Sequence, residues 1–364
     1  MGLLDHPGVL AVDSMGLIEE TGRAVAMFDA AIERARAVEI PFPAEAVRSV
    51  AICGMGGSAI AGDLIVGAFW ERLRRPVQVV RDYYLPGWVG EDTLVIGSSF
   101  SGTTEETLTC MMDAIDRTCP AVGISTGGRF ADYYAPRGVP LVQVPPAPMP
   151  RAALVQMLAA TLVVLERFEV VPPLESELVE ARETLATAVR SYGPDAPEDV
   201  NPAKQVAAML NERVPLVWGA EITAPIAYRW KCQLNENAKV PAYCARLPEH
   251  NHNEIVGIEG IGAAGARTRV IMLQDPRNHR QVGRRFGITE DLVDPFVEGV
   301  TRIEAEGQGA LARMLDLVML GDYASLYLAC LREVDPGPIT MIDRLKERLA
   351  TTPYGRTADP DAQG

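Results

Sequence analysis

The sequence predicts an α/β protein in which short parallel strands alternate with helices. Short apolar segments recur along the chain, and most are followed by a turn rich in glycine or serine and then by a helical pattern. Such alternation is typical of parallel sheets covered by helices on both faces. The length of 364 residues, with 48% apolar and 23% charged residues, indicates two ordinary globular domains.

The first half is expected to open with an amphipathic helix at residues 15–36. An apolar stretch at 152–165 is interrupted by Gln156 and is too short to span a bilayer, so we expect a buried helix there. The strands expected between these helices are Ser49–Cys53, Val77–Val80, Thr93–Ser98, Ala121–Ser125 and Pro140–Val144.

The second half follows the segment Val171-Pro172-Pro173. A charged helix is expected at 174–189 and a loop rich in proline and acidic residues at 193–202. A strand at 214–219 then leads through glycine into a helix, as residues 50–54 do, which hints at duplicated architecture. The remaining elements are a strand at 269–274 and helices at 223–237, 302–332 and 339–349.

These patterns predict two domains, residues 1–170 and residues 171–364. The end of the second, from about residue 351, is polar and contains proline and glycine, so we expect it to fray.

The net charge of −14 limits the classes of partner. It argues against a general binder of nucleic acid or of anionic membranes. A small anionic ligand remains compatible with it, because backbone N–H groups can hold an anion without net positive charge.

The cysteines and the N-terminus predict a cytoplasmic protein. No two cysteines form a CxxC pair and most lie in apolar runs, so we expect reduced, buried thiols. Residues 1–12 lack a basic segment followed by an apolar one, so no signal peptide is expected. The cysteines are Cys53, Cys110, Cys119, Cys232, Cys244 and Cys330.

Hydroxyl side chains gather where the third expected strand leads into a helix. Residues 99–104 read Ser-Phe-Ser-Gly-Thr-Thr, and Glu105 and Glu106 follow. An ordinary helix cap needs one Ser or Thr, with acidic residues in the first turn. Four hydroxyls around Gly102 exceed that need, and a helix N-terminus with free N–H groups suits a phosphate. We therefore favour a phosphate-binding loop over an ordinary cap.

A glycine-rich turn, Gly-Met-Gly-Gly-Ser-Ala at 54–59, follows the first expected strand. As G-x-G-x-x-A it fits a dinucleotide fingerprint, with Asp82 as a candidate ribose ligand. However, Ser58 adds a hydroxyl where a dinucleotide loop needs only backbone. Ligands of open parallel sheets bind at the carboxyl ends of the strands, so Gly57 and Ser58 should lie near the 99–104 loop. Two such loops suit a phosphomonoester better than a pyrophosphate.

Arg151 follows a proline-rich approach at residues 144–150 and precedes an expected helix. The prolines stiffen that approach. One interpretation is a surface arginine. A helix start is a poor electrostatic position for a cation, which favours an anionic partner instead.

Glu236 lies near the end of an apolar helix, within Asn235-Glu236-Asn237-Ala238-Lys239. A carboxylate there faces the negative end of the helix dipole, which favours proton uptake, as a general base requires. The flanking asparagines could orient it without adding charge. The alternative is a helix that simply ends in polar residues.

Two of the four histidines, His250 and His252, lie in Glu249-His250-Asn251-His252-Asn253-Glu254. In an extended chain both would point to the same side, as a metal pair would. No third ligand follows at a convincing spacing, so we favour an acid–base role for one histidine over a metal site. Lys346, in an amphipathic terminal helix, is by its pattern a solvated surface lysine.

Together these segments resemble the bifunctional phosphoglucose/phosphomannose isomerases of the sugar isomerase (SIS) domain superfamily. The resemblance covers nearly the whole chain in the same order, and its Asn-Glu-Asn and Asn-His-Asn-Glu blocks are specific to this family. The matching segments are Gly54–Asp63, Ser99–Thr107, Pro150-Arg151, Asn235–Lys239, Leu247–Glu249, Asn251–Ile255 and Ile342–Lys346.

The resemblance implies two SIS domains, each a five-stranded parallel sheet flanked by helices, and a homodimer. It also implies which residues hold the 6-phosphate of a sugar. These phosphate-binding residues are Gly57, Ser58, Ser99, Ser101 and Thr104.

The resemblance further implies catalytic roles. Glu236 looks like the base that moves a proton between C1 and C2 of the sugar. His252 and Lys346 look like the ring-opening pair, for which the histidine can come from the other subunit. Arg151 is similar to the arginine that stabilises the enediolate, and Thr340 lies near the position that separates single from dual activity.

The expected activity is therefore interconversion of glucose 6-phosphate, mannose 6-phosphate or both with fructose 6-phosphate through a cis-enediol(ate). It needs no redox cofactor, and no metal if Glu236 and Arg151 share the chemistry. The expected partner is a hexose 6-phosphate, not nucleic acid or a membrane. The alternatives are a non-catalytic sugar-phosphate sensor, a dehydrogenase that uses residues 54–59, and a metal-dependent isomerase built on His250 and His252.

Overall fold

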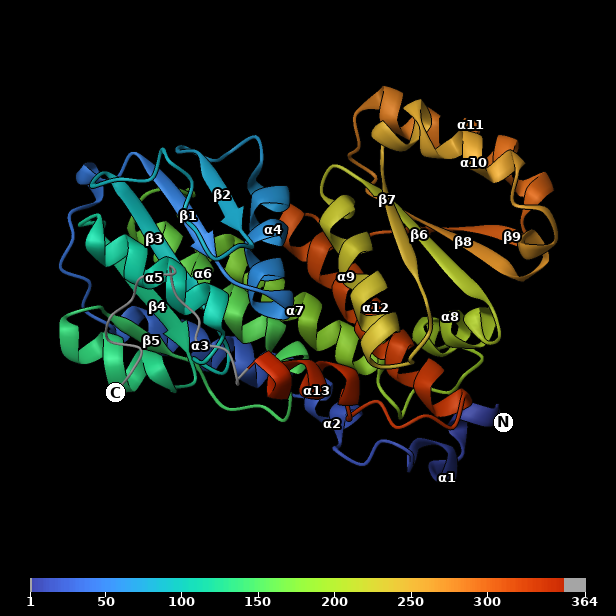
Figure 1. The fold of residues 1–364 in the computed structure, drawn as a ribbon. Coiled ribbons are helices and arrows are strands. Elements are labelled where there is room, and N and C mark those ends of the chain that lie inside the picture. The colour runs from blue at the N-terminus through green and yellow to red at the C-terminus, as the bar shows by residue number, and fades with distance from the viewer. Residues whose placement is uncertain (1, 350–364) are drawn as a thin grey trace. The chain divides into compact units, whose positions relative to one another are not determined.

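The computed structural model describes residues 2–349, and its contacts divide the chain into two compact units (Figure 1). The five-stranded unit comprises residues 30–62, 73–172 and 338–349. The four-stranded unit comprises residues 2–29, 63–72 and 173–337. One division, between residues 172 and 173, lies close to the predicted boundary at 170. The tail expected to fray lies outside the described residues.

The first sheet is parallel throughout and has the strand order β2-β1-β3-β4-β5. The sequence predicts its first four strands at the observed bounds, and the fifth is shorter than predicted. These strands can be recognised in the sequence because β1, β3 and β4 are apolar and almost wholly buried. The strands are β1 (Ser49–Cys53), β2 (Val77–Val80), β3 (Thr93–Ser98), β4 (Ala121–Ser125) and β5 (Leu141–Gln143).

The second sheet is also parallel, with the order β7-β6-β8-β9. Five strands were expected, and the described residues form four. The sequence pattern does not predict the edge strands β7 and β9, and it predicts a helix where residues 302–304 of β9 lie. Both edges are partly exposed and carry charged residues, so their apolar signal is weak. The strands are β6 (Val214–Ala220), β7 (Tyr243–Leu247), β8 (Thr268–Gln274) and β9 (Gly299–Glu304).

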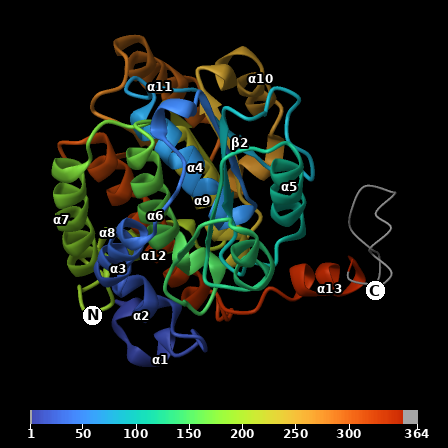
Figure 2. The same ribbon diagram turned by 90° about the vertical axis from the view of Figure 1, so that its left-hand side faces the viewer.

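Helices cover both sheets. In the first unit, α5 packs on one face through Leu108 and Met111, and α6 contacts β4. In the second unit, α10 and α11 lie side by side over the sheet, and α9 contacts β6 and β8 (Figures 1 and 2). The principal helices are α3 (Ala24–Ala37), α4 (Gly56–Phe69), α5 (Glu105–Asp116), α6 (Leu154–Arg167), α7 (Glu175–Tyr192), α9 (Thr223–Glu236), α10 (Glu254–Glu259), α11 (Arg280–Val293), α12 (Ala310–Leu331) and α13 (Thr340–Leu349).

The shorter helices correct two predictions. The single helix expected at 15–36 is divided at Arg23. The loop expected to reach residue 202 ends at Asn201, whose side-chain oxygen caps a helix that starts with proline. These helices are α1 (Pro7–Leu10), α2 (Leu17–Gly22) and α8 (Pro202–Leu210).

Buried residues dominate α6 and α12. The predicted buried helix is α6, and nearly all its residues are inaccessible. In the described part of the chain, α12 alone has the length and apolar composition to cross a membrane, but its side chains are almost all buried within the protein. The six cysteines form no disulfide, as predicted.

Helix α9, which carries Glu236 at its end, is held against α12 by buried hydrogen bonds and an ion pair. The Arg229 guanidinium donates to both carboxylate oxygens of Asp322, at 2.9 and 2.6 Å, and both residues are buried. Trp230 Nε1 donates to the Leu317 carbonyl at 2.8 Å. These contacts fix the orientation of the helix that presents the candidate base.

We expect Asp322→Asn to lower the free energy of unfolding by about 3 kcal/mol, because it leaves the buried Arg229 charge uncompensated. Chemical denaturation measures this change. Asp29→Asn is the matched control, since Asp29 pairs with Arg182 on the surface, and it should cost less than about 1 kcal/mol. Equal effects of the two substitutions would contradict the assigned importance of the buried pair.

Candidate active site

Two loops of the five-stranded unit meet through Ser58. This residue lies in the first turn of α4 and is 6% exposed. Its Oγ accepts a hydrogen bond from the Phe100 backbone N–H at 3.1 Å, and Ser98 Oγ donates to its carbonyl at 3.0 Å. The Ser58 hydroxyl proton remains available to a ligand. The predicted convergence of the β1–α4 turn and the β3–α5 loop is therefore observed.

The β3–α5 loop holds a network of hydroxyls. Ser99 Oγ and Thr104 Oγ1 lie 2.9 Å apart, and the Gly102 N–H donates to Ser99 Oγ at 3.1 Å. The exposed Ser101 pairs with Thr103 at 2.9 Å. We call Ser58, Ser99, Ser101 and Thr104 the hydroxyl cradle.

Thr104 distinguishes this loop from an ordinary helix cap. It occupies the N-cap position of α5, yet its side chain makes no capping hydrogen bond and instead contacts Ser99. The interpretation of the loop as a simple cap is therefore wrong for this hydroxyl. A helix N-terminus without a side-chain cap suits an anionic ligand.

A third turn, which the sequence analysis did not assign to the site, supports the loop from β4. Thr126 donates to the Phe100 carbonyl through its backbone N–H at 3.0 Å and its hydroxyl at 2.8 Å. The Arg129 N–H donates to the Gly102 carbonyl at 3.0 Å. The available signal was the run Ser125-Thr126-Gly127-Gly128 directly after an expected strand.

Arg151 belongs to the same unit and is 3% exposed, so it is not the surface arginine of the alternative interpretation. It lies in the short helical turn Pro150–Ala153. A Cβ built on Gly57 would come within 3.3 Å of the Pro150 carbonyl oxygen and 3.6 Å of the Arg151 Cα. The backbone of Arg151 therefore packs against the turn that leads into Ser58.

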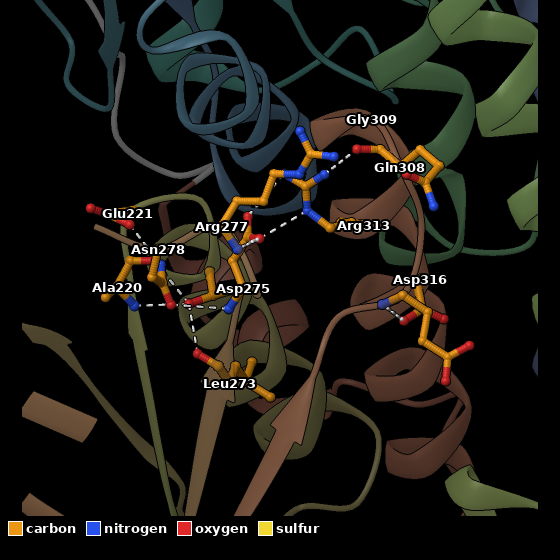
Figure 3. Close-up of polar contacts among 12 residues, drawn as sticks. Ala220, Glu221, Leu273, Asp275, Arg277, Asn278, Gln308, Gly309, Arg313 and Asp316 are labelled. Atoms are coloured by element: carbon orange, nitrogen blue, oxygen red, sulfur yellow. Dashed lines mark hydrogen bonds and ion pairs between the residues drawn. The ribbon is translucent and has the colours of Figure 1, made fainter. Parts of the chain in front are cut away.

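The second sheet holds its own carboxylates at the corresponding strand ends (Figure 3). Glu221 follows β6 and accepts hydrogen bonds from Asn278 Nδ2 at 2.6 Å and from the backbone N–H of His279 at 3.1 Å. Asp275 follows β8 and binds Arg313 Nε at 2.9 Å. These carboxylates occupy donors that an anionic ligand would need, which favours the first sheet as the anion site.

Glu236 is the last residue of α9 and is partly exposed. The flanking asparagines anchor the helix end, since Asn235 Nδ2 donates to the Val240 carbonyl at 2.7 Å and Asn237 Nδ2 to Ser325 Oγ at 2.9 Å. Lys239 Nζ donates to the Glu236 carbonyl. The backbone around Glu236 is therefore held on both sides.

The two histidines differ in environment. They lie in a helical turn, Glu249–His252, and not in the extended chain that the metal-pair interpretation requires. His252 is exposed, whereas His250 is 1% exposed and its ring lies 4.2 Å from that of Trp218. Residues 2–349 hold no group of three or more His, Cys, Asp or Glu side chains placed to bind a metal ion.

Burial lowers the pKa of His250 to about 4. The unfolded chain takes up a proton near the ordinary pKa of about 6.5, so stability is full above that pH and falls as the pH decreases toward 4. We expect His250→Phe to remove this pH-dependent contribution to the free energy of unfolding, which is at most about 3 kcal/mol. Denaturant unfolding at a series of pH values measures it, and parallel stability curves for the two proteins would contradict the prediction.

Lys346 and Thr340 lie on α13, where both are exposed. This helix and the hydroxyl cradle belong to the five-stranded unit, whereas Glu236 and His252 belong to the four-stranded unit. The structure thus brings together the predicted phosphate-binding residues and the backbone of Arg151. The catalytic roles of the remaining residues stay predictions.

Comparison with known proteins finds similarity over most of the chain. A family model described as the bacterial phospho-glucose isomerase C-terminal SIS domain matches residues 199–349. A bifunctional phosphoglucose/phosphomannose isomerase of Caldicellulosiruptor bescii is 38% identical over 88% of this chain and 95% of its own. One of Aquifex aeolicus is 35% identical over 83% of this chain and 90% of its own.

Solved structures share the fold. A glucose-6-phosphate isomerase like protein from Thermus thermophilus superposes with a TM-score of 0.63 at 23% identity, over 94% of this chain and 100% of that one. The C-terminal domain of glucosamine-fructose-6-phosphate aminotransferase from Francisella tularensis gives a TM-score of 0.68 at 13% identity, over 88% and 97%. At these identities the likeness supports the fold alone.

Proposed function

The chain belongs to the bifunctional phosphoglucose/phosphomannose isomerase family, and we propose on this basis that it interconverts fructose 6-phosphate with glucose 6-phosphate and mannose 6-phosphate. The observation that carries the site assignment is the hydrogen bond between the Phe100 N–H and Ser58 Oγ, which joins the two phosphate loops. Family membership also favours an enzyme over a sensor, and an isomerase over a dehydrogenase.

The hydroxyl cradle binds the 6-phosphate in this proposal. Its serines and threonines donate to the phosphate oxygens, and the uncapped start of α5 adds N–H groups and a positive dipole end. The phosphate is remote from C1 and C2, so its binding energy holds the open-chain sugar in place for reaction.

Glu236 is the proposed base. Starting from fructose 6-phosphate, its carboxylate removes a proton from C1, and the C2 carbonyl oxygen takes up the electron pair as an enediolate. Arg151 is the proposed cation that stabilises this negative charge. A proton moves from the C1 hydroxyl to the C2 oxygen, and return of the carbon-bound proton to C2 then gives the C1 aldehyde of an aldose and regenerates the carboxylate.

One intermediate explains two products. Glucose 6-phosphate and mannose 6-phosphate differ only in configuration at C2, so both derive from the same 1,2-enediol. Protonation on one face of C2 gives one aldose, and protonation on the other face gives its epimer. One base serves both faces if the enediol turns about its C2–C3 bond, so the scheme requires this rotation.

Ring opening and assembly complete the proposal. His252 and Lys346 transfer protons between the ring oxygen and the anomeric hydroxyl, as the family resemblance implies. We also propose a homodimer, in which the histidine can come from either subunit. Light scattering after size-exclusion chromatography tests the dimer directly.

The test of function is an assay of the purified protein with fructose 6-phosphate, without added metal or nucleotide. We expect both glucose 6-phosphate and mannose 6-phosphate, each quantified by chromatography. Formation of neither aldose would contradict the proposal. Each aldose is then offered separately, since return to fructose 6-phosphate from only one would show that a single activity is present.

A less similar relative has a different activity by its name. A D-glucosamine-6-phosphate 4-epimerase of Sulfolobus acidocaldarius is 27% identical over 82% of this chain. Its substrate, by its name, is a hexosamine phosphate. Glucosamine 6-phosphate should therefore be included in the assay, and we expect it to be unchanged while fructose 6-phosphate is converted.

A further inference from the structure

Two acidic residues directly follow the hydroxyl cradle, the proposed phosphate site. Glu105 and Glu106 form the first residues of α5, directly after the hydroxyl cradle residue Thr104. Acidic side chains in a first turn stabilise the helix, but they repel a phosphate bound at the same N-terminus. A site of this kind gains affinity if the negative charge is held away from the ligand.

Tyr83 provides such a contact to one of them. Its hydroxyl donates a hydrogen bond to Glu105 Oε1. This hydrogen bond, together with burial, raises the pKa of the Tyr83 phenol above its ordinary value. The donated hydrogen bond fixes the Glu105 carboxylate on the side of the β2–β3 loop and disperses part of its charge.

The loop that carries Tyr83 is held against α5 by other contacts as well. Cys110 Sγ contacts the Asp82 carbonyl at 3.1 Å, and the Leu85 N–H donates to Asp113 Oδ2 at 3.3 Å. Arg117 Nη1 donates to the Pro86 carbonyl at 2.9 Å. The loop should therefore keep its place when the Tyr83 hydroxyl alone is removed.

We propose that Tyr83 is a positioning residue which, by holding Glu105, sets the affinity of the hydroxyl cradle for a sugar phosphate. The inference rests on the proposed function, in which the cradle binds the 6-phosphate. Tyr83 acts on the binding of the phosphate and not on the proton transfer at C1 and C2. It therefore influences KM and leaves kcat unchanged.

A double-mutant cycle tests this. Tyr83→Phe should raise the KM for fructose 6-phosphate about threefold with kcat unchanged, because the freed carboxylate faces the phosphate. Glu105→Gln removes the charge and should not raise KM. In Tyr83→Phe/Glu105→Gln, KM should equal that of Glu105→Gln, since the phenol then has no charge to hold.

Isothermal titration calorimetry with inorganic phosphate measures the affinity of the same variants without turnover, and so repeats the double-mutant cycle for binding alone. If the wild-type protein converts no sugar, the proposed function fails, yet the phosphate cycle still decides the role of Tyr83. Tyr133→Phe is the matched control, because it removes a tyrosine hydroxyl elsewhere in the same unit and keeps the ring that faces Arg137.

The inference is overturned by an unchanged KM in Tyr83→Phe. It is equally overturned if Tyr83→Phe raises KM as much in the Glu105→Gln background, because the tyrosine would then not act through Glu105. A fall in kcat with constant KM would also overturn it. Near-wild-type circular dichroism of each variant shows that these outcomes do not reflect misfolding.

Discussion

Replacement of Glu236 by glutamine is expected to lower kcat by about 10³-fold while substrate affinity stays within about twofold. The amide has nearly the same shape as the carboxylate but cannot take up the C1 proton. The side chains of Asn235, Asn237 and Lys239 anchor the helix end through the Val240 carbonyl, the Ser325 hydroxyl and the Glu236 carbonyl. Steady-state kinetics and titration with fructose 6-phosphate measure the two quantities separately.

Glu259→Gln is the matched control, since Glu259 is also the last residue of a helix, α10, and is exposed. It should retain full turnover. If Glu236→Gln retains more than about a tenth of the wild-type kcat, Glu236 is not the base. If it loses binding together with turnover, its carboxylate contributes to affinity and the separation of roles is wrong.

Gly102→Ala is expected to lower kcat/KM by at least about 100-fold, because it displaces the loop that carries the hydroxyl cradle. Gly102 has φ +68°, and a Cβ there would come within 2.0 Å of the Gly127 carbonyl oxygen and 2.7 Å of Ser125 Oγ. The β3–α5 loop and the β4 turn must therefore separate. The loss should appear in KM and in the binding of inorganic phosphate.

Gly138→Ala is the matched control, because it introduces the same kind of backbone strain as Gly102→Ala without the steric clash. Gly138 also has positive φ, +85°, but a Cβ there meets no atom within 4 Å. It should cost some stability and leave kcat/KM near wild type. Ser99→Ala offers a milder change in the same loop, with an expected rise in KM of about tenfold. Unchanged kinetics in Gly102→Ala or in Ser99→Ala would contradict the assignment of the cradle.

The first sheet could be predicted because its central strands are buried on both faces. Such strands are continuous apolar runs with glycine or serine at their ends, and both signals are local. The edge strands β7 and β9 gave no such signal. Tyr243–Leu247 is short and mixes exposed and buried residues without regular alternation, and Gly299–Glu304 is partly exposed throughout. Their pairing with β6 and β8 supplies a stability that the local sequence does not reveal.

The candidate site was predictable to the extent that its residues are contiguous. Ser99, Ser101 and Thr104 lie in one loop, and Ser58 follows a recognisable turn. The support from Thr126, which holds Phe100, depends on a contact between segments far apart in sequence. The burial of Arg151 also depends on tertiary packing, and periodicity could not distinguish it from a surface residue.

The central claim is that Glu236 transfers a proton between C1 and C2 of a sugar held by its phosphate. The most direct measurement is the conversion of fructose 6-phosphate in D₂O, followed by NMR of the carbon-bound hydrogens. We expect deuterium at C2 of the aldose products and at C1 of recovered ketose, and no incorporation with Glu236→Gln. Equal conversion and equal deuterium incorporation by the Glu236→Gln protein would contradict the claim.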